Sequence, residues 1–512
     1  MLSRLKNAKI ILNSYLWNVT ILTKNKMEIE IKNFGPIDNL KFDLDKDLHL
    51  IYGQNAIGKS YATYCLYCLI KNIKNKAISN RYAYFEKPDD NSFEKFIKLK
   101  VKNLKSNTPI DCTKDFLKLV DNELKEVILK GLQNSLLNTF SSLKNLKNRY
   151  SEKNYELIIS ISKSEKLTIF SNNEGALDLK YVDDFKKVEI VQKPTKSTKF
   201  SFYVNDLKAF GKPTEEDFYN EFIRYTFTKV NQILRKLDFN IRDIYYLPAS
   251  RSGLYQALNA FTPIIAELTQ NRFFMQNKSI ELPSLSEPLA DYFIDLSTVD
   301  KKHINKEFEG VIKLLQNNIL RGEVEYNEKT RRILYKPNGI DLELNLSEAS
   351  SMVAELSPLV LYFKHILNNK YASTKGRDFF FMDQYYDNAN RRKKDRGYDI
   401  LFIEEPEAHL HPEVQVELIK IFAKLSELKL KIFITSHSNY MFNKLNNLLI
   451  KKEIDKKNIM VYHLVRTEDG TTVNSEMKVT EDGINDDNFQ DISEKLYNDR
   501  LNYLEGNDDK KN

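Results

Sequence analysis

The chain has 512 residues, of which 42% are hydrophobic, and its 78 basic and 71 acidic residues give a formal net charge of +7. This length and apolar content exclude a disordered chain and allow one elaborated domain or several smaller ones. The mildly basic balance permits contact with nucleic acid but does not by itself indicate it. Only three cysteines occur, which excludes a disulfide framework and favours a cytoplasmic protein.

The first 26 residues differ in pattern from the rest of the chain. Their apolar stretch "IILNSYLWNVTIL" is interrupted by Asn13, Ser14, Asn18 and Thr20, so it is too polar to span a bilayer. From Met27 the segment "MEIEIKNFGPI" alternates apolar and polar residues, which is typical of a strand. We therefore predict that residues 1–26 are an N-terminal extension or reflect an upstream start, and that no part of the chain enters a membrane.

A phosphate-binding loop follows the next predicted strand. "FDLDKDLHLIY" leads into "GQNAIGKS", and the helical pattern "YATYCLYCLIKNI" comes next. In a G-x-x-x-x-G-K-S loop, backbone N–H groups surround phosphate oxygens, the lysine adds a positive charge and the serine hydroxyl binds Mg²⁺. We predict that ATP and Mg²⁺ bind here; the residues assigned to them are Gly53, Asn55, Gly58, Lys59 and Ser60. A glycine-containing turn before a helix is the alternative.

Two glutamates end a second buried strand. In "DILFIEEPE", Glu404 and Glu405 follow an apolar run, and Pro406 ends the strand. Adjacent strand residues point to opposite faces, so the two acids are expected to have different tasks. We predict that Glu404 holds Mg²⁺ and that Glu405 polarises the attacking water. The strand "LKIFITSHS" then places His437 where an imidazole can hydrogen-bond a γ-phosphate.

Two short motifs suggest metal sites but lack further ligands. His409 and His411 form H-x-H, and Cys65 and Cys68 form C-x-x-C inside a helical run. No second cluster at a suitable spacing completes a zinc tetrahedron around either pair. We therefore prefer a nucleotide site to a zinc site for the first motif and a packed helix for the second.

The segments "GQNAIGKS", "LFIEEPEAHLHPE" and "ITSHS" together resemble the P-loop, Walker B with D-loop, and H-switch of ABC-type ATPases. The motif E-E-P-E-A-H-L-H-P resembles the corresponding motif of the SMC/OLD-like branch. This branch includes the ATPase domains of OLD-family nucleases and related phage-defence ATPases. The resemblance implies an α/β P-loop NTPase fold: an ABC-type ATPase head with an antiparallel β-subdomain and an inserted helical lobe. No Toprim nuclease domain is expected, because 75 residues without a metal-carboxylate cluster follow His437.

The resemblance also implies a signature segment and further contacts. "LNLSEASSMVAELSPLVLYFKHIL" fits the signature position, where Ser350 and Ser351 would begin a helix that touches the γ-phosphate bound to another protomer. Met352 departs from the glycine common at this place. Arg251 is assigned to phosphate or to the other protomer, with a loop salt bridge as the alternative, and Gln192 resembles a Q-loop glutamine that binds Mg²⁺.

The resemblance divides the chain into several regions. Residues 27–75 and 324–465 are assigned to the ATPase core, residues 76–323 to an inserted helical lobe, a β-subdomain and a helical region, and residues 466–512 to a C-terminal helix with an acidic tail. The insertion 371–397 combines aromatic and basic residues, which suit either nucleic-acid contact or a solvated loop with a partner-docking patch.

These features favour an ATPase that dimerises or forms a higher homo-oligomer around ATP and controls a separately encoded effector, as in phage defence. A DNA-repair or chromosome-type clamp that closes on DNA is the alternative. A small-molecule kinase is disfavoured by the double-acid strand end and by His437. DNA binding that strengthens with ATP would favour the clamp, whereas a stable complex with a neighbouring gene product would favour the switch.

Overall fold

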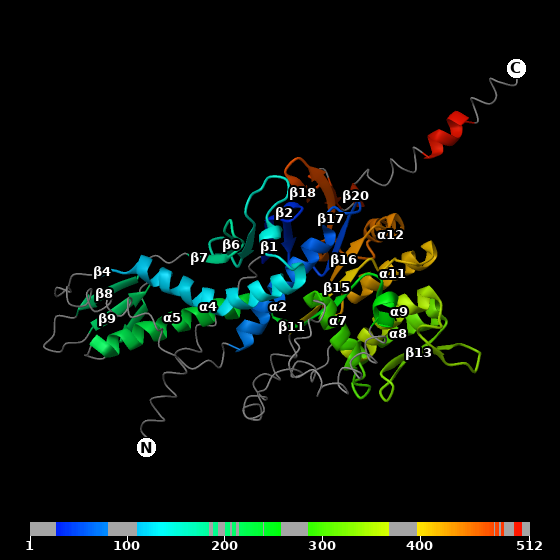
Figure 1. The fold of residues 1–512 in the computed structure, drawn as a ribbon, viewed down its shortest axis with the longest axis horizontal. Helices are drawn as coiled ribbons and strands as arrows, with labels where there is room; N and C mark the ends of the chain where they lie inside the picture. The colour runs from blue at the N-terminus through cyan, green and yellow to red at the C-terminus, as the bar shows by residue number, and fades with distance from the viewer. Residues whose placement is uncertain are drawn as a thin grey trace, which may run out of the picture.

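A large central sheet organises the protein (Figure 1). Within the described residues it has 11 strands in the order β11-β15-β16-β3-β17-β18-β2-β1-β5-β6-β7. Helices lie on both of its faces, so the fold is α/β and the predicted P-loop ATPase fold class is confirmed. The computed structural model describes residues 27–79, 110–183, 188–192, 200–204, 207–210, 215–238, 240–257, 285–367, 397–475, 477–480, 483–485 and 496–503.

Five neighbouring strands of the sheet are parallel. β15 pairs with β11 on one side and with β16 on the other, and β3 lies between β16 and β17. All of their carboxyl ends therefore meet at one edge of the sheet, where ligands bind in open α/β folds. The bounds are β11 (Ile241–Leu247), β15 (Tyr398–Glu404), β16 (Leu430–Ser436), β3 (Leu48–Gly53) and β17 (Ile459–Thr467).

The rest of the sheet is mainly antiparallel. β1 pairs with both β2 and β5, and β5, β6 and β7 continue as a meander. β18 joins this part to the parallel strands through β17 and β2. The strands are β1 (Glu28–Phe34), β2 (Ile37–Asp43), β5 (Glu156–Ser160), β6 (Lys166–Ser171), β7 (Leu177–Val182) and β18 (Gly470–Val473).

One predicted strand is in fact two. The run "FDLDKDLHLIY" was expected to be continuous, but β2 ends at Asp43 and β3 begins at Leu48. The Asp43 side chain accepts a hydrogen bond from the Asp45 backbone N–H at 3.1 Å, and the Asp43 carbonyl accepts one from the Lys46 N–H at 3.2 Å. Such local bonding by aspartate favours a turn over a strand.

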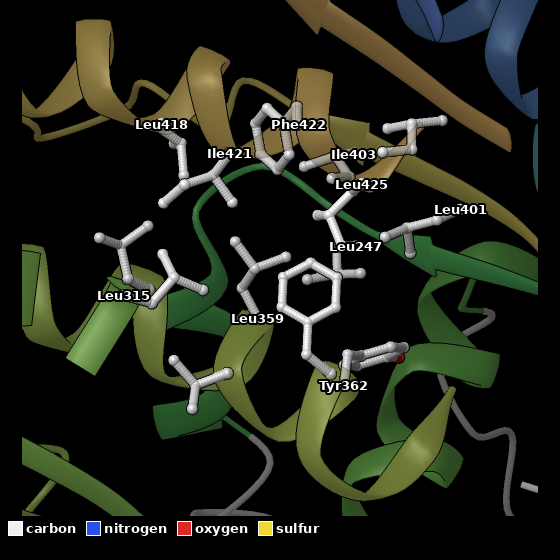
Figure 2. Close-up of a cluster of buried hydrophobic side chains, with 14 of the residues drawn as sticks. Leu247, Leu315, Leu359, Tyr362, Leu401, Ile403, Leu418, Ile421, Phe422 and Leu425 are labelled. Atoms are coloured by element: carbon white, nitrogen blue, oxygen red, sulfur yellow. The ribbon is translucent and has the colours of Figure 1, made fainter. Parts of the chain in front are cut away.

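The parallel strands bury a different set of side chains on each face. Ile400 and Phe402 of β15 pack with the cluster around helix α2, whereas Leu401 and Ile403 pack with the opposite cluster. Figure 2 shows the second cluster, where Phe422 and its neighbours lie between the strands and the surrounding helices. Alternation of period two thus fixes which helices each residue of β15 meets.

The helices covering these faces come from distant parts of the chain. The first face is covered by α2 (Lys59–Ser79), α4 (Thr113–Phe140) and α5 (Glu215–Leu237). The second face is covered by α7 (Glu287–Ser297), α8 (Glu309–Lys313) with the π-helical segment Leu314–Leu320, α9 (Ser351–Leu361) with its π-helical continuation Tyr362–Ile366, α11 (Pro412–Leu425) and α12 (Asn439–Ile450).

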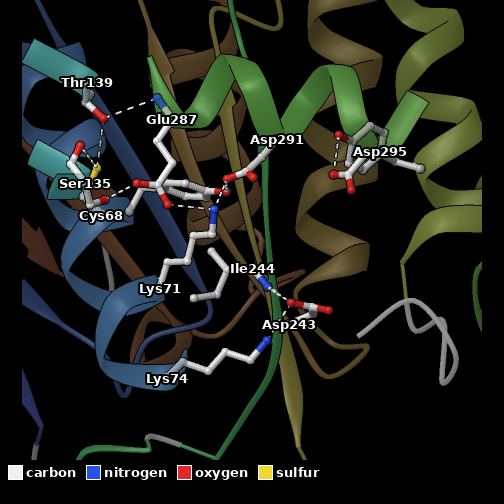
Figure 3. Close-up of polar contacts among 12 residues, drawn as sticks. Cys68, Lys71, Lys74, Ser135, Thr139, Asp243, Ile244, Glu287, Asp291 and Asp295 are labelled. Carbon is white, nitrogen blue, oxygen red and sulfur yellow. Dashed lines mark hydrogen bonds and ion pairs between the residues drawn. The ribbon is translucent and has the colours of Figure 1, made fainter. Parts of the chain in front are cut away.

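Helix α2 is also tied to its neighbours by charged side chains (Figure 3). Lys71 pairs with Glu287 and Asp291 of α7. Three residues further along α2, Lys74 pairs with Asp243 of β11, with its Nζ 2.6 Å from Oδ1. These pairs fix the helix that follows the phosphate loop against both α7 and the edge strand.

Smaller sheets lie outside the central one. The strand β9 (Phe200–Val204) belongs to a four-stranded sheet and not to the meander β5–β7. Its other strands are β10 (Leu207–Phe210), β8 (Val188–Gln192) and β4 (Ile110–Asp111). Two further sheets lie in the described residues. β12 (Gly322–Asn327), β13 (Arg332–Pro337) and β14 (Leu344–Asn345) form a meander, and β19 (Lys478–Thr480) pairs with β20 (Gly483–Asn485).

The central sheet draws on more of the chain than the two segments assigned to the ATPase core. β5, β6, β7 and β11 all come from residues 76–323. Residues 1–26 and most of the insertion 371–397 lie outside the described residues. The predicted domain boundaries stay a prediction.

Candidate active site

The phosphate loop leaves β3 at Gly53 and enters α2 at Lys59. Two of its glycines are required by close contacts. A Cβ on Gly53 would lie 2.7 Å from the Leu464 carbonyl oxygen, and a Cβ on Gly58, whose φ is 104°, would lie 2.7 Å from Pro36 Cγ. The loop curls closely against β17 and the β1–β2 turn, which gives the geometric reason for glycine at both positions.

Lys59 reaches across this loop. Its Nζ donates hydrogen bonds to the carbonyl oxygens of Gly53 at 3.0 Å and Gln54 at 2.9 Å, and lies 3.4 Å from His437 Nδ1. Burial lowers the pKa of Lys59 to about 8, against the opposing effect of Glu405, Glu407 and Glu404. The ammonium group is therefore held among carboxylates at the carboxyl edge of the sheet.

Glu404 is the last residue of β15 and is only 5% exposed. It follows Ile400 and Phe402 on the face covered by α2, where Tyr64 donates a hydrogen bond to Glu404 Oε2 at 3.4 Å. Burial raises the pKa of the carboxyl group, and hydrogen bonds that include one from Ser60 oppose the rise. Its Oε1 atom is buried without a hydrogen-bond partner.

Glu405 has a left-handed backbone, with φ of 41°. This conformation is unusual for a residue with a Cβ and marks a place where the surrounding structure imposes the geometry. Glu405 Oε1 lies 3.5 Å from His437 Nε2. The hydrogen bond with His437 lowers the pKa of Glu405 below its usual value, and the charges of Lys59 and Arg251 act in the same direction.

His437 therefore lies between an acid and a base, with one ring nitrogen toward Lys59 and the other toward Glu405. The chain holds it through Glu407, whose Oε1 accepts hydrogen bonds from the His437 N–H at 2.6 Å and the Ser436 hydroxyl at 2.9 Å. Sequence reasoning gave Glu407 no role. Glu407 lies beyond Pro406 and outside the strand, so the hydrophobic periodicity of the strand makes no prediction about it.

The donor set fits Mg²⁺ bound together with phosphates. The Glu404 carboxyl group interacts with the exposed Ser60, and one of its oxygens, Oε1, is buried with no hydrogen-bond partner among the described residues. Mg²⁺ usually takes one or two carboxylates and the phosphates of its nucleotide, not an all-protein cage. Among the described residues no group of three or more His, Cys, Asp and Glu side chains is arranged to hold a metal ion.

Arg251 was assigned to phosphate or to another protomer, but the structure places it inside its own chain. The side chain is 2% exposed and forms an ion pair with Glu355, with Nη2 3.3 Å from Oε2. Its Nη1 donates to the carbonyl oxygens of Pro248 at 3.0 Å and Glu404 at 2.8 Å. The contacts agree with the alternative of a salt bridge within the chain, and the contact of Arg251 with phosphate or with another protomer stays a prediction.

The signature-like serines are exposed at the start of α9. The predicted cap is confirmed, because the Ser350 side chain accepts a hydrogen bond from the Val353 N–H. Ser351 is the first residue of the helix. The contact of both serines with a nucleotide, like that of Asn55, which is exposed in the phosphate loop, stays a prediction.

Gln192 is the last residue of β8, in the four-stranded sheet. Figure 1 places β8 at one end of the molecule, away from β15 and β16. β8 thus belongs to a different sheet from β15 and β3, and the Mg²⁺ contact assigned to Gln192 stays a prediction. The resemblance to a Q-loop rested on a strand followed by glutamine, a pattern that does not specify which sheet the strand joins.

Fold and site define a P-loop ATPase. The sequence matches the model of the AAA ATPase domain family over residues 27–442, and the chain belongs to this family. No curated protein matches the sequence.

The solved structures to which the chain is similar include SMC head domains. One is the SMC head bound to the C-terminal winged-helix domain of ScpA, at 10% identity and a TM-score of 0.34, covering 87% of this chain and 96% of that one. Another is the SMC head domain from Thermotoga maritima, at 11% identity and a TM-score of 0.29, covering 88% and 98%. In the described part of the chain, no helix has the length and apolar character needed to cross a membrane.

Proposed function

We propose that the protein binds Mg-ATP at the carboxyl edge of the parallel strands and hydrolyses it with Glu405 as the general base. The observation that carries this proposal is the left-handed turn at Glu405, which brings its carboxylate beside His437 while Glu404 stays on the α2 face. Two adjacent acids thereby serve two tasks.

The chain's own groups suit each task. Glu405, whose pKa is lowered, remains ionised at neutral pH and can accept a proton from water. Lys59 would supply positive charge to the β- and γ-phosphates, and His437 would hydrogen-bond the γ-phosphate. Ser60 and Glu404 would hold Mg²⁺, which would offset the negative charge of the phosphates.

We further propose that ATP joins two copies of the chain and that this switch controls a separate effector protein, as in anti-phage defence. Support comes from the exposed start of α9, where the Ser350 cap leaves a helix N-terminus available to an anion. The resemblance of E-E-P-E-A-H-L-H-P to OLD-like ATPases points to the same use. A second copy is required because Ser350 and Ser351 would contact the nucleotide of the partner.

The test compares Glu405→Gln with Glu404→Gln. Glu405→Gln should bind Mg-ATP normally and hydrolyse it roughly 100-fold more slowly, the usual range for loss of a general base. Because hydrolysis no longer opens the closed state, this variant should accumulate as a dimer in Mg-ATP. Glu404→Gln should instead lose the Mg²⁺ dependence of binding.

Solution mass with and without Mg-ATP, together with nucleotide occupancy, distinguishes the outcomes. Equal hydrolysis by wild type and Glu405→Gln contradicts the catalytic assignment. A monomer mass at full occupancy contradicts ATP-driven dimerisation and leaves the ATPase assignment standing. ATP-strengthened, salt-dependent DNA binding by the dimer would replace effector control with the DNA-clamp function.

A further inference from the structure

The buried pair formed by Arg251 and Glu355 connects three parts of the site. Arg251 follows β11 in a helical segment, residues 251–257, and Glu355 lies on α9 five residues after the Ser350 cap. Glu355 is fully buried, and besides the ion pair its carboxylate accepts hydrogen bonds from the Arg251 and Ser252 N–H groups at 3.1 and 3.2 Å and from the Ser252 hydroxyl at 2.5 Å. The pair therefore locks the end of β11 to α9.

The guanidinium extends this connection to the two acids of β15. Arg251 Nη1 donates to the Glu404 carbonyl oxygen at 2.8 Å, and Nη2 donates to the Glu405 carbonyl oxygen at 3.4 Å. Its Nε donates to the Glu355 carbonyl oxygen at 3.0 Å. Because guanidinium is planar and always charged, one side chain can fix several carbonyls in a defined arrangement.

The Glu405 turn needs such support. A left-handed conformation costs a residue with a Cβ roughly 1–2 kcal/mol, so the surroundings must impose it. On one side the Glu405 N–H donates to the Thr435 carbonyl oxygen of β16 at 2.9 Å. On the other side the carbonyl groups of Glu404 and Glu405 are held by Arg251.

We propose that Arg251 and Glu355 are positioning residues: they hold the left-handed Glu405 turn and connect it to the helix that begins at Ser350. This inference rests on the proposed ATPase function and adds a physical link between α9 and the general base. Contact of the α9 start with a nucleotide would thereby act on the geometry of Glu405 through one buried ion pair.

The hydrolysis test is a double-mutant cycle. Arg251→Gln should lower kcat by roughly tenfold or more with little change in ATP affinity, because it disturbs the base and not the phosphate loop. In a Glu405→Gln background the same substitution should cause no further loss in single-turnover hydrolysis of radiolabelled ATP, since both changes act through one group. Glu355→Gln, which keeps side-chain size and an oxygen for Ser252, should follow the same pattern if Arg251→Gln folds poorly.

Arg242 provides the matched control. It pairs with Asp399 at the other end of the same two strands, with Nε 2.9 Å from Oδ1. Arg242→Gln should reduce the urea midpoint of unfolding and leave kcat unchanged. Independent, multiplicative losses of kcat from Arg251→Gln and Glu405→Gln, or an equal loss of kcat in Arg242→Gln, would overturn the positioning role.

A second cycle tests the turn without relying on ATP hydrolysis. Glycine adopts the left-handed conformation without strain, so Arg251→Gln should shift the urea midpoint less in a Glu405→Gly background than in wild type. An equal shift in both backgrounds would show that Arg251 does not hold this turn. If wild type and Glu405→Gln hydrolyse ATP equally, the proposed function fails, and the midpoint shifts still decide this inference.

Discussion

The two ends of the parallel strands are built differently. At the amino ends, buried charges are fully paired: Arg242 forms two hydrogen bonds with Asp399, and Lys431 Nζ donates to the Lys46 carbonyl oxygen at 2.8 Å and to Asp47 Oδ1 at 2.9 Å. At the carboxyl ends, two buried carboxylate groups are not fully hydrogen-bonded. Glu404 Oε1 and Glu407 Oε2 are buried without hydrogen-bond partners.

The same end of the strands also carries the unfavourable backbone and the perturbed cation. Glu405 has its left-handed φ there, and the pKa of Lys59 is lowered by burial to about 8. Buried carboxylate oxygens without hydrogen bonds and strained backbone both lower the stability of the folded state. Such features are found mainly at functional sites, where they take part in binding or catalysis. The comparison agrees with an amino edge that stabilises the sheet and a carboxyl edge that carries the proposed ATP site.

Among the predictions that test this difference between the two edges, Lys59→Ala should have the largest effect, which is a loss of ATP affinity. Removing the Lys59 ammonium group, which lies among Glu404, Glu405 and Glu407, deletes charge-assisted bonds to the phosphates, and ATP affinity should fall roughly 100-fold. Lys74→Ala is the control, because this lysine lies on the same helix but pairs with Asp243. Calorimetric titration with Mg-ATP decides the matter, and equal affinity in Lys59→Ala and wild type would rule out the phosphate loop as the binding site.

The pH dependence of binding should come next in size. With a pKa of about 8 in the free protein, Lys59 loses its charge as the pH rises through that value, whereas bound phosphates keep it protonated. The Kd for ATP should therefore rise about tenfold between pH 7 and pH 9. Lys59→Arg, which stays charged, should show a flat profile over the same range, and an equally flat profile in wild type would contradict the lowered pKa.

Substitution of Glu407 should give a smaller loss of kcat. Two variants distinguish the hydrogen bonds that Glu407 accepts from its negative charge. Glu407→Ala removes the acceptor for the His437 N–H and the Ser436 hydroxyl, so hydrolysis should fall by roughly tenfold as His437 loses its position. Glu407→Gln keeps an acceptor oxygen and should lose less than about threefold. Steady-state kcat is the measurement, and equal losses in the two variants would show that the negative charge of Glu407 matters more than its hydrogen bonds.

Much of the site was predictable because its motifs depend on local rules. The phosphate loop follows a strand and precedes a helix, and the two acids end a buried apolar run, so Lys59, Ser60, Glu404 and Glu405 could be assigned by pattern. The fold class followed from the same elements. Their meeting at one edge is a consequence of parallel pairing.

Other features depend on tertiary contacts that no pattern specifies. Arg251 was expected to face a ligand, but its partner Glu355 lies 104 residues away. Gln192 follows a strand that joins a different sheet. The turn at Asp43 was missed because the apolar pattern of the two strands on either side reads as one. Backbone conformation at Glu405 leaves no trace in the sequence, since glutamate is not a residue that favours φ above zero.

The central claim is the division between the two edges, and one paired measurement tests it most directly: kcat and the free energy of unfolding for Glu405→Gln and Arg242→Gln, side by side. Glu405→Gln should lose roughly 100-fold in kcat with stability unchanged or slightly higher. Arg242→Gln should lose ~3–5 kcal/mol of stability, because the buried Asp399 carboxylate loses the positive charge of Arg242, with kcat unchanged. Parallel losses of both quantities in both variants would contradict the account.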